Sequence, residues 1–150
     1  MDQNKITVFT KYFLNIMFYS GILVVLSLPY TLQLVGKYYL PEFERYYWPM
    51  LIIYFLSGIS GLIIVYQLRK MIRTVIEKNC FVKNNIISLK IMGKVSFLIT
   101  FLQFIKVLFV TSSASFVIIL TFFIAGIFSH VLGLVFAEAV RFKEENDLTI

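Results

Sequence analysis

Long runs of apolar residues, separated by short polar segments, make up most of this chain. A helix needs roughly 20 residues to cross about 30 Å of hydrocarbon. Four runs are long enough, namely residues 12–35, 50–68, 91–111 and 116–140. The pattern therefore predicts an all-α integral membrane protein, a four-helix bundle that forms one domain over residues 1–150.

The connection between the third and fourth runs is very short. Only a few residues around Ser112, Ser113 and Ser115 join them. Helices joined by so short a loop lie antiparallel as direct neighbours. We therefore expect the third and fourth helices to form a tight antiparallel hairpin.

Basic residues gather on one side of the predicted helices, as they do in cytoplasmic segments of membrane proteins. Eleven of the 14 fall in the N-terminal segment, the 69–94 segment and the tail: Lys5, Lys11, Arg69, Lys70, Arg73, Lys78, Lys83, Lys90, Lys94, Arg141 and Lys143. We expect both termini, a basic loop over 69–90 and an acidic tail over 141–150 to be cytoplasmic. Lys106, near the outer end of the third helix, is expected to extend its amine outward.

The composition supports this picture. Apolar residues make up 59% of the chain, above the roughly 45–50% of soluble domains. The net charge of +6 comes from residues placed to face lipid head groups, so we expect no direct nucleic-acid binding. A single cysteine, Cys80, and a single histidine exclude a disulfide framework and a zinc site within one chain. We expect no metal and no cofactor.

The segment between the first two predicted helices, residues 36–49, is rich in Tyr, Phe and Trp. Tyr and Trp settle at the depth of lipid head groups, which favours an interfacial aromatic belt. An aromatic recognition surface is the alternative interpretation.

Small residues recur every four positions along the fourth predicted helix, at Ala125, Ser129, Gly133 and Ala137. Transmembrane helices associate through close backbone approach, which small side chains permit. We expect this stripe to be a helix-packing surface. It would pack against another helix of the same chain or against a second copy in a homo-oligomer.

Three polar side chains are expected to have structural roles. His130 lies inside the fourth predicted helix, where an interhelical hydrogen bond would satisfy its imidazole. Lys94 and Glu138 lie at similar depths, which predicts an ion pair across the hairpin. Ser60 and His130 occur in sequences similar to rhomboid protease motifs, but that family has at least six spans, so we expect no enzyme.

Two segments carry a resemblance to a known family. The first contains Asn79, Phe81, Val82, Asn85, Leu89 and Gly93, and the second is Glu-Glu-Asn-Asp-Leu-Thr-Ile at residues 144–150. They resemble conserved segments of the bacterial DUF2975 family of small four-helix membrane proteins, whose biochemical activity is not established. The resemblance implies a multi-pass protein of the bacterial cytoplasmic membrane. It also implies a partner, since members are often encoded beside a small helix-turn-helix regulator.

These features favour a non-enzymatic membrane protein that acts as a regulator by binding a cytoplasmic partner such as a small helix-turn-helix transcription factor. The candidate partner-binding residues are Arg73, Phe81, Asn85, Lys90, Glu144, Glu145, Asp147 and Ile150. Two alternatives stay open. One is a small transporter or channel component that works as an oligomer, and the other is an immunity protein against a membrane-active peptide.

Overall fold

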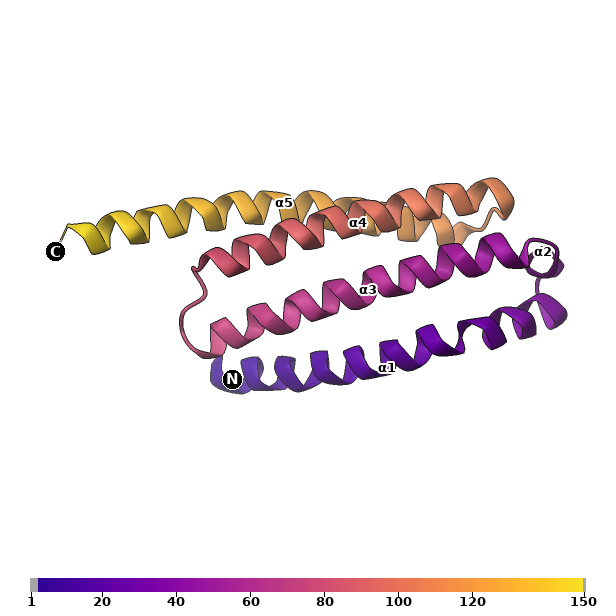
Figure 1. Ribbon diagram of the computed structural model, residues 1–150, viewed down its shortest axis with the longest axis horizontal. Coiled ribbons are helices and arrows are strands. Elements are labelled where there is room, and N and C mark those ends of the chain that lie inside the picture. Colours follow the sequence, from indigo (N-terminus) through magenta and orange to yellow (C-terminus); the bar gives the residue numbers. More distant parts are fainter. Residues whose placement is uncertain (1–2, 150) are drawn as a thin grey trace.

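The computed structural model describes residues 3–149, and all regular secondary structure in that range is α-helical. The elements are α1 (Gln3–Tyr38), α2 (Pro41–Arg45), α3 (Tyr47–Ile76), α4 (Lys83–Phe109) and α5 (Ser113–Leu148). All but α2 are long and apolar enough to cross a membrane, which confirms the predicted all-α membrane fold. Figure 1 shows that α1 begins and α5 ends at the same end of the molecule, which we call the terminal end. The opposite end, which carries α2, is the α2 end.

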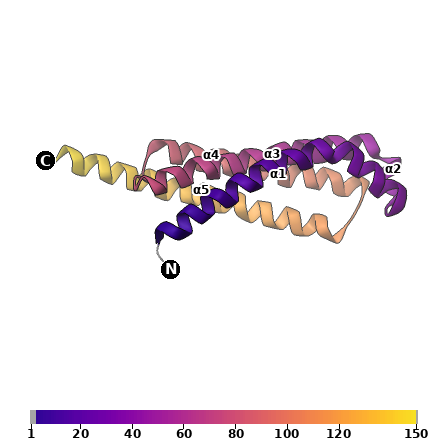
Figure 2. The same cartoon turned by 90° about the horizontal axis from the view of Figure 1, so that it is seen from below.

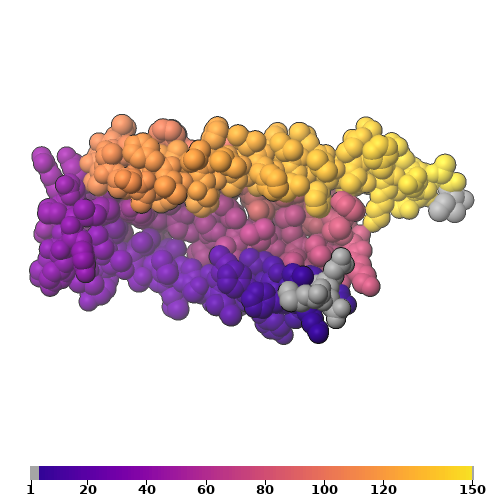
Figure 3. All heavy atoms as spheres, turned by 180° about the vertical axis from the view of Figure 1, so that it is seen from behind, coloured from indigo at the N-terminus to yellow at the C-terminus, as the bar shows by residue number. Residues whose placement is uncertain are grey.

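The four long helices follow one another as a row. Packing contacts join α1 to α3, α3 to α4 and α4 to α5. Within residues 3–149, the backbone of α1 makes no close approach to α4 or α5. Seen from behind, α5 and α1 lie on one face with parts of α3 and α4 visible between them, so this face is hollowed (Figure 3).

Three of the four predicted spans lie inside longer helices, and the third, 91–111, runs two residues past the end of α4. The longer helices also correct the predicted loop over 69–90. Residues 69–76 complete α3 and residues 83–90 begin α4, which leaves only 77–82 as a connection. The reason is local, because neither flanking stretch contains a Gly or Pro that would end a helix at the membrane boundary.

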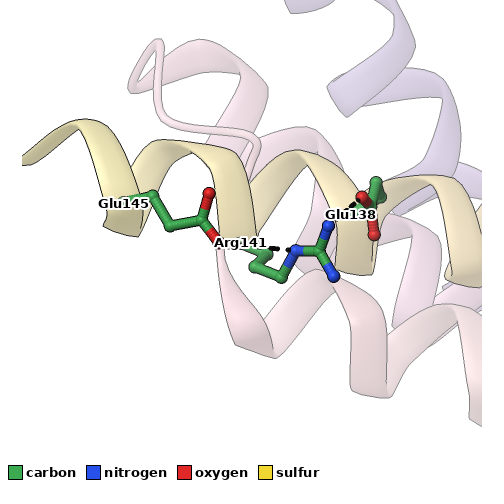
Figure 4. Close-up of polar contacts among 3 residues, drawn as sticks. All are labelled: Glu138, Arg141 and Glu145. Carbon is green, nitrogen blue, oxygen red and sulfur yellow. Dashed lines mark hydrogen bonds and ion pairs between the residues drawn. The ribbon is translucent and has the colours of Figure 1, made fainter.

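The predicted tail is also helical, because α5 continues to Leu148 and projects beyond the other helices at the terminal end (Figure 2). Arg141 supports this extension. Its guanidinium lies 2.6 Å from a carboxylate oxygen of Glu138 and 3.6 Å from one of Glu145, one turn away on either side (Figure 4). Such pairs stabilise a solvent-exposed helix. The acidic segment is therefore an extension of the last transmembrane helix, not a loose peptide.

The helices α4 and α5 form the closely packed hairpin that the short connection predicts. A Cβ atom at Gly93 would lie 3.3 Å from the carbonyl oxygen of Gly126, and one at Gly133 would lie 3.7 Å from Leu89 Cβ. Within the predicted small-residue stripe, Ser129 and Gly133 are buried, whereas Ala125 and Ala137 are half-buried. Small residues on both helices thus allow two backbones of the same chain to approach closely.

The aromatic segment at the α2 end divides into a buried part and an exposed part. Phe43 of α2 is buried in a cluster with Leu32, Met50 and Val110. A Cβ atom at Gly36 would lie 3.0 Å from the backbone nitrogen of Glu44, so glycine lets α2 fold closely onto the end of α1. The most exposed aromatic side chains of the segment are Tyr38, Tyr39 and Trp48.

Lys106 reaches toward the α2 end as expected, but its amine does not emerge into solvent. The residue is 3% exposed, and Nζ donates hydrogen bonds to Ser112 Oγ at 2.9 Å and Ser115 Oγ at 2.5 Å. The Phe43 ring lies 6.0 Å from the same nitrogen. Ser112 lies in the short α4–α5 connection and Ser115 in the first turn of α5. Both hydroxyl groups accept hydrogen bonds from the amine, which is therefore paired within the protein.

Candidate functional site

A cleft of about 350 Å³ opens at the terminal end between the 77–82 connection with the start of α4 and the last turns of α5. We call it the terminal cleft. Its walls combine apolar side chains with charges of both signs. The lining residues are Phe81, Val82, Lys83, Asn84, Val140, Lys143, Glu144 and Asp147.

The chain enters the 77–82 connection through a Schellman motif at the end of α3. The backbone N–H of Asn79 donates to Thr74 O at 2.9 Å, and that of Lys78 donates to Val75 O at 3.1 Å. Lys78 has a φ of 55°, in the left-handed region that this motif usually reserves for glycine. The chain can therefore reverse its direction directly after α3.

The side chain of Asn85 fixes the shape of the 77–82 connection through two hydrogen bonds. Its Nδ2 donates to Thr74 Oγ1 at 2.6 Å and to the Cys80 carbonyl oxygen at 2.7 Å. The side chain is only 2% exposed. This corrects the expectation that Asn85 contacts a partner, because both amide hydrogens are used inside the protein and the residue is buried.

Two further contacts hold the connection against α5. The rings of Phe81 and Phe136 pack with centroids 5.3 Å apart. Lys143 Nζ donates to Asn79 Oδ1 at 2.8 Å, although the two residues are 64 positions apart in sequence. Asn79 and Phe81, in the first of the two segments that resemble the family, therefore hold the wall of the cleft in position. Leu89 and Gly93 of the same segment pack α4 against α5.

The acidic end of α5 and the basic start of α4 meet at one ion pair. Lys83 Nζ lies 2.9 Å from Glu144 Oε1, with both side chains more than half exposed. Exposed pairs of this kind contribute about 0.2–1 kcal/mol and are screened by salt. The pair closes one side of the terminal cleft with a contact that can open at small cost.

The expected ion pair between Lys94 and Glu138 is not formed. Glu138 bonds Arg141 on its own helix, and Lys94 is exposed on α4. A partner three residues away on the same helix is held close by the helix itself, whereas a pair across the hairpin would need both side chains to extend over the packed surface.

The remaining candidate partner-binding residues are distributed over the terminal end. Glu144 and Asp147 line the terminal cleft, and Glu145 is exposed beside it. Lys90 is exposed on α4, and Arg73 lines a different pocket between α1 and α3. Ile150 lies outside the described residues. The structure thus brings Glu144, Asp147 and Phe81 together in one cleft, whereas Arg73 lies in a separate pocket.

His130 is exposed on the outer side of α5, and its imidazole makes no hydrogen bond with any residue of 3–149. The expected interhelical hydrogen bond is therefore wrong. Since Ser129 and Gly133 turn toward α4, the adjacent position 130 points away from the hairpin. Ser60 is buried in α3, which does not pack on α5, so these two residues are not brought together.

Two concave regions were not expected from the sequence. One is a basic pocket of about 290 Å³ between α1 and α3 at the terminal end. The other is an apolar groove on the hollowed face, also about 290 Å³, lined by residues of all four long helices. Each is lined by residues that are far apart in sequence, so it can be recognised only once the packing of the helices is known.

The fold and the terminal cleft define a multi-pass α-helical membrane protein with a helical extension beyond the bundle. The chain matches the family described as "Protein of unknown function (DUF2975)" over residues 37–150. It belongs to that family, as the segments around Asn85 and Glu144 indicate. No curated protein and no solved structure matches the chain.

Proposed function

We propose that this protein is a non-enzymatic membrane regulator that binds a cytoplasmic protein in the terminal cleft. We assign the terminal end to the cytoplasm because eleven of the 14 basic residues belong to segments at that end. The bacterial cytoplasmic membrane is the proposed location. The candidate partner is a small helix-turn-helix transcription factor, as the family resemblance implies.

One observation carries this proposal. The two segments that bear the family resemblance are far apart in sequence, yet both contribute walls to the terminal cleft. The first segment shapes the cleft through Asn85 and Phe81, and the second supplies Glu144 and Asp147. A family-specific surface that projects from the membrane is a natural place for a protein partner to dock.

The chemistry of the cleft suits a partner with an apolar anchor and basic side chains. Phe81 is 44% exposed although its ring packs on Phe136. A Lys or Arg side chain of the partner would displace Lys83 from its ion pair with Glu144. A second basic side chain would pair with Asp147, which has no ion pair with the described residues. Because the Lys83–Glu144 pair is weak, this exchange costs little.

The test is an in-cell crosslink and pull-down with charge-reversed variants. Glu144→Lys with Asp147→Lys changes the cleft, and Glu42→Lys with Glu44→Lys makes the same change of charge at the α2 end. We expect wild type and the α2-end variant to capture a small DNA-binding protein and the cleft variant to lose it. Trimming residues 147–150 should also abolish capture. Equal capture by all forms would overturn the proposed docking role of the cleft.

A transport role is the second candidate, and the apolar groove favours it. Ser57 and Gln103 line this groove, and Ser57 Oγ and Gln103 Oε1 are buried without a hydrogen-bond partner among the described residues. The apolar surface of the groove would fit an apolar molecule. A Cβ atom at Gly61 would meet nothing within 4 Å, so Gly61→Leu extends a side chain into the open space of the groove. Transport of a hydrophobic dye by proteoliposomes, abolished by Gly61→Leu, would support this role, and no transport by wild type would count against it.

The immunity role remains a third candidate, which the exposed aromatic side chains of the α2 end support. Tyr38, Tyr39 and Trp48 present aromatic rings on the side of the membrane opposite the terminal cleft. If Tyr39→Ser with Trp48→Ser left protection against a membrane-active peptide unchanged, this role would be excluded for that surface.

A further inference from the structure

A basic pocket between α1 and α3 at the terminal end is separate from the terminal cleft, which α4 and α5 form. The pocket has a volume of about 290 Å³ and is lined by residues from the first half of α1 and the second half of α3. Four of the lining residues are cationic, and none of the described lining residues is acidic. They are Lys11, Asn15, Tyr66, Arg69, Lys70, Ile72 and Arg73.

Arg69 is held in place at the centre of this pocket. Its Nε donates to Asn15 Oδ1 at 2.8 Å. The guanidinium carbon lies 4.6 Å from the centroid of the Phe18 ring and 5.6 Å from that of Tyr19. These contacts use one nitrogen and the face of the guanidinium, which leaves the two terminal nitrogens for a ligand. A planar fork of this kind matches two oxygens of a phosphate group.

The other cations of the pocket have no partners of opposite charge. Lys11, Lys70 and Arg73 are exposed and form no ion pair or hydrogen bond with residues 3–149. Four positive charges that line one pocket repel one another. A bound anion would relieve this repulsion, so the arrangement is complementary to an oxyanion such as a phosphate group.

We propose that this pocket binds the phosphate of an anionic phospholipid head group. The phosphate would lie between Arg69 and Arg73, with Lys11 and Lys70 completing the charge. A lipid is favoured over a soluble anion by the place of the pocket, because it lies where two apolar helices reach the membrane boundary. Tyr66 and Ile72 line it, and Tyr66 is 49% exposed, as expected for an aromatic side chain at head-group depth. The proposal does not depend on a partner in the terminal cleft.

The test uses delipidated full-length protein in detergent, with native mass spectrometry to count bound lipids. Phosphatidylglycerol and phosphatidylcholine are added in turn. The pocket variant is Lys70→Gln with Arg73→Gln. The matched control is Lys90→Gln with Lys94→Gln, which removes two exposed positive charges from α4 at the same end. None of these four side chains has a hydrogen bond or ion pair within residues 3–149, so we expect both variants to fold.

We expect wild type and control to retain one phosphatidylglycerol, with at least about tenfold preference over phosphatidylcholine. The pocket variant should lose this preference. Arg69→Lys keeps the charge but not the planar fork, so it should bind at least about threefold more weakly than wild type. If the pocket variant and the control lost the preference for phosphatidylglycerol equally, the lipid would be held by the positive charge of the whole terminal end and not by the pocket. That result would overturn the proposal. Displacement of the lipid by millimolar inorganic phosphate would overturn the lipid as the source of the phosphate.

Discussion

Asn85 Nδ2 lies 2.6 Å from Thr74 Oγ1, and this contact joins the end of α3 to the start of α4 beneath the terminal cleft. The same amide group holds the Cys80 carbonyl oxygen at 2.7 Å. This buried side chain therefore ties the 77–82 connection to the end of α3 and the start of α4. Asn85 belongs to the segment that carries the family resemblance, so part of that resemblance is a requirement of the fold.

Replacement of Asn85 by Ala should destabilise the protein by about 1–3 kcal/mol, because it removes two hydrogen bonds made by a buried amide group. Asn84→Ala changes an exposed neighbour without a hydrogen bond among the described residues and should stay within about 0.5 kcal/mol of wild type. Thermal unfolding in detergent, followed by circular dichroism, compares the two. Similar unfolding temperatures for both variants would contradict the role given to Asn85.

Lys78→Gly should stabilise the protein by about 0.5–1 kcal/mol. Lys78 has a φ of 55°, a left-handed conformation that costs a side-chain-bearing residue more than it costs glycine. Lys78→Ala separates this effect from the loss of a charge, since alanine retains the strain. The unfolding temperature should rise for glycine and change little for alanine. A fall with glycine would mean that Lys78 makes a contribution that its backbone conformation does not explain.

Gly93→Leu should separate α4 from α5 and destabilise the hairpin by about 2 kcal/mol or more. The added side chain would meet the backbone at Gly126, 3.3 Å from its carbonyl oxygen, which cannot move aside as a side chain can. Gly61→Leu is the control, because a Cβ atom there meets nothing within 4 Å. Resistance to unfolding by dodecyl sulfate measures both, and equal resistance would show that the hairpin tolerates a wider spacing.

Replacing Ser115 alone should destabilise the protein more than replacing Lys106 alone. Ser115→Ala removes an acceptor from a buried amine and should cost about 1–3 kcal/mol. Lys106→Met removes the amine itself, and the two serines can still bond each other across 2.9 Å, so this change should be nearly neutral or stabilising. A larger loss for Lys106→Met than for Ser115→Ala would contradict the account of the α2 end.

The spans and the hairpin were open to prediction because hydropathy and loop length act locally. The ends of the helices were not, because the polar residues that mark the predicted membrane boundary do not themselves end a helix, as residues 69–76 and 83–90 show. The hydrophobic pattern therefore located the lipid-facing parts of the helices and underestimated their total length.

The site was predictable only in part. The basic segment and the acidic tail were expected on the same side of the membrane, and the structure joins Lys83 to Glu144. The pocket around Arg69 was missed because Lys11 and Arg73 are distant in sequence and meet only when α1 packs on α3. The spacing of Lys11 and Asn15, and of Arg69 and Arg73, by one helical turn was the available signal.

The proposed regulatory role requires the terminal end to face the cytoplasm, and labelling of single cysteines can test this orientation. In a Cys80→Ser background, Asn146→Cys and Tyr39→Cys lie at opposite ends of the molecule, and both positions are exposed. A reagent that does not cross the membrane should label Tyr39→Cys in intact cells and Asn146→Cys only after the cells are opened. The reverse pattern would place the terminal cleft outside the cytoplasm.

Binding of a cytoplasmic protein in the terminal cleft, as proposed, is tested most directly by a photocrosslinking amino acid at position 147, within the cleft, compared with the same residue at position 39 at the α2 end, both in living cells. We expect position 147, and not position 39, to crosslink to a small DNA-binding protein identified by mass spectrometry. Crosslinks from position 147 only to lipid or to copies of this chain would contradict this proposal.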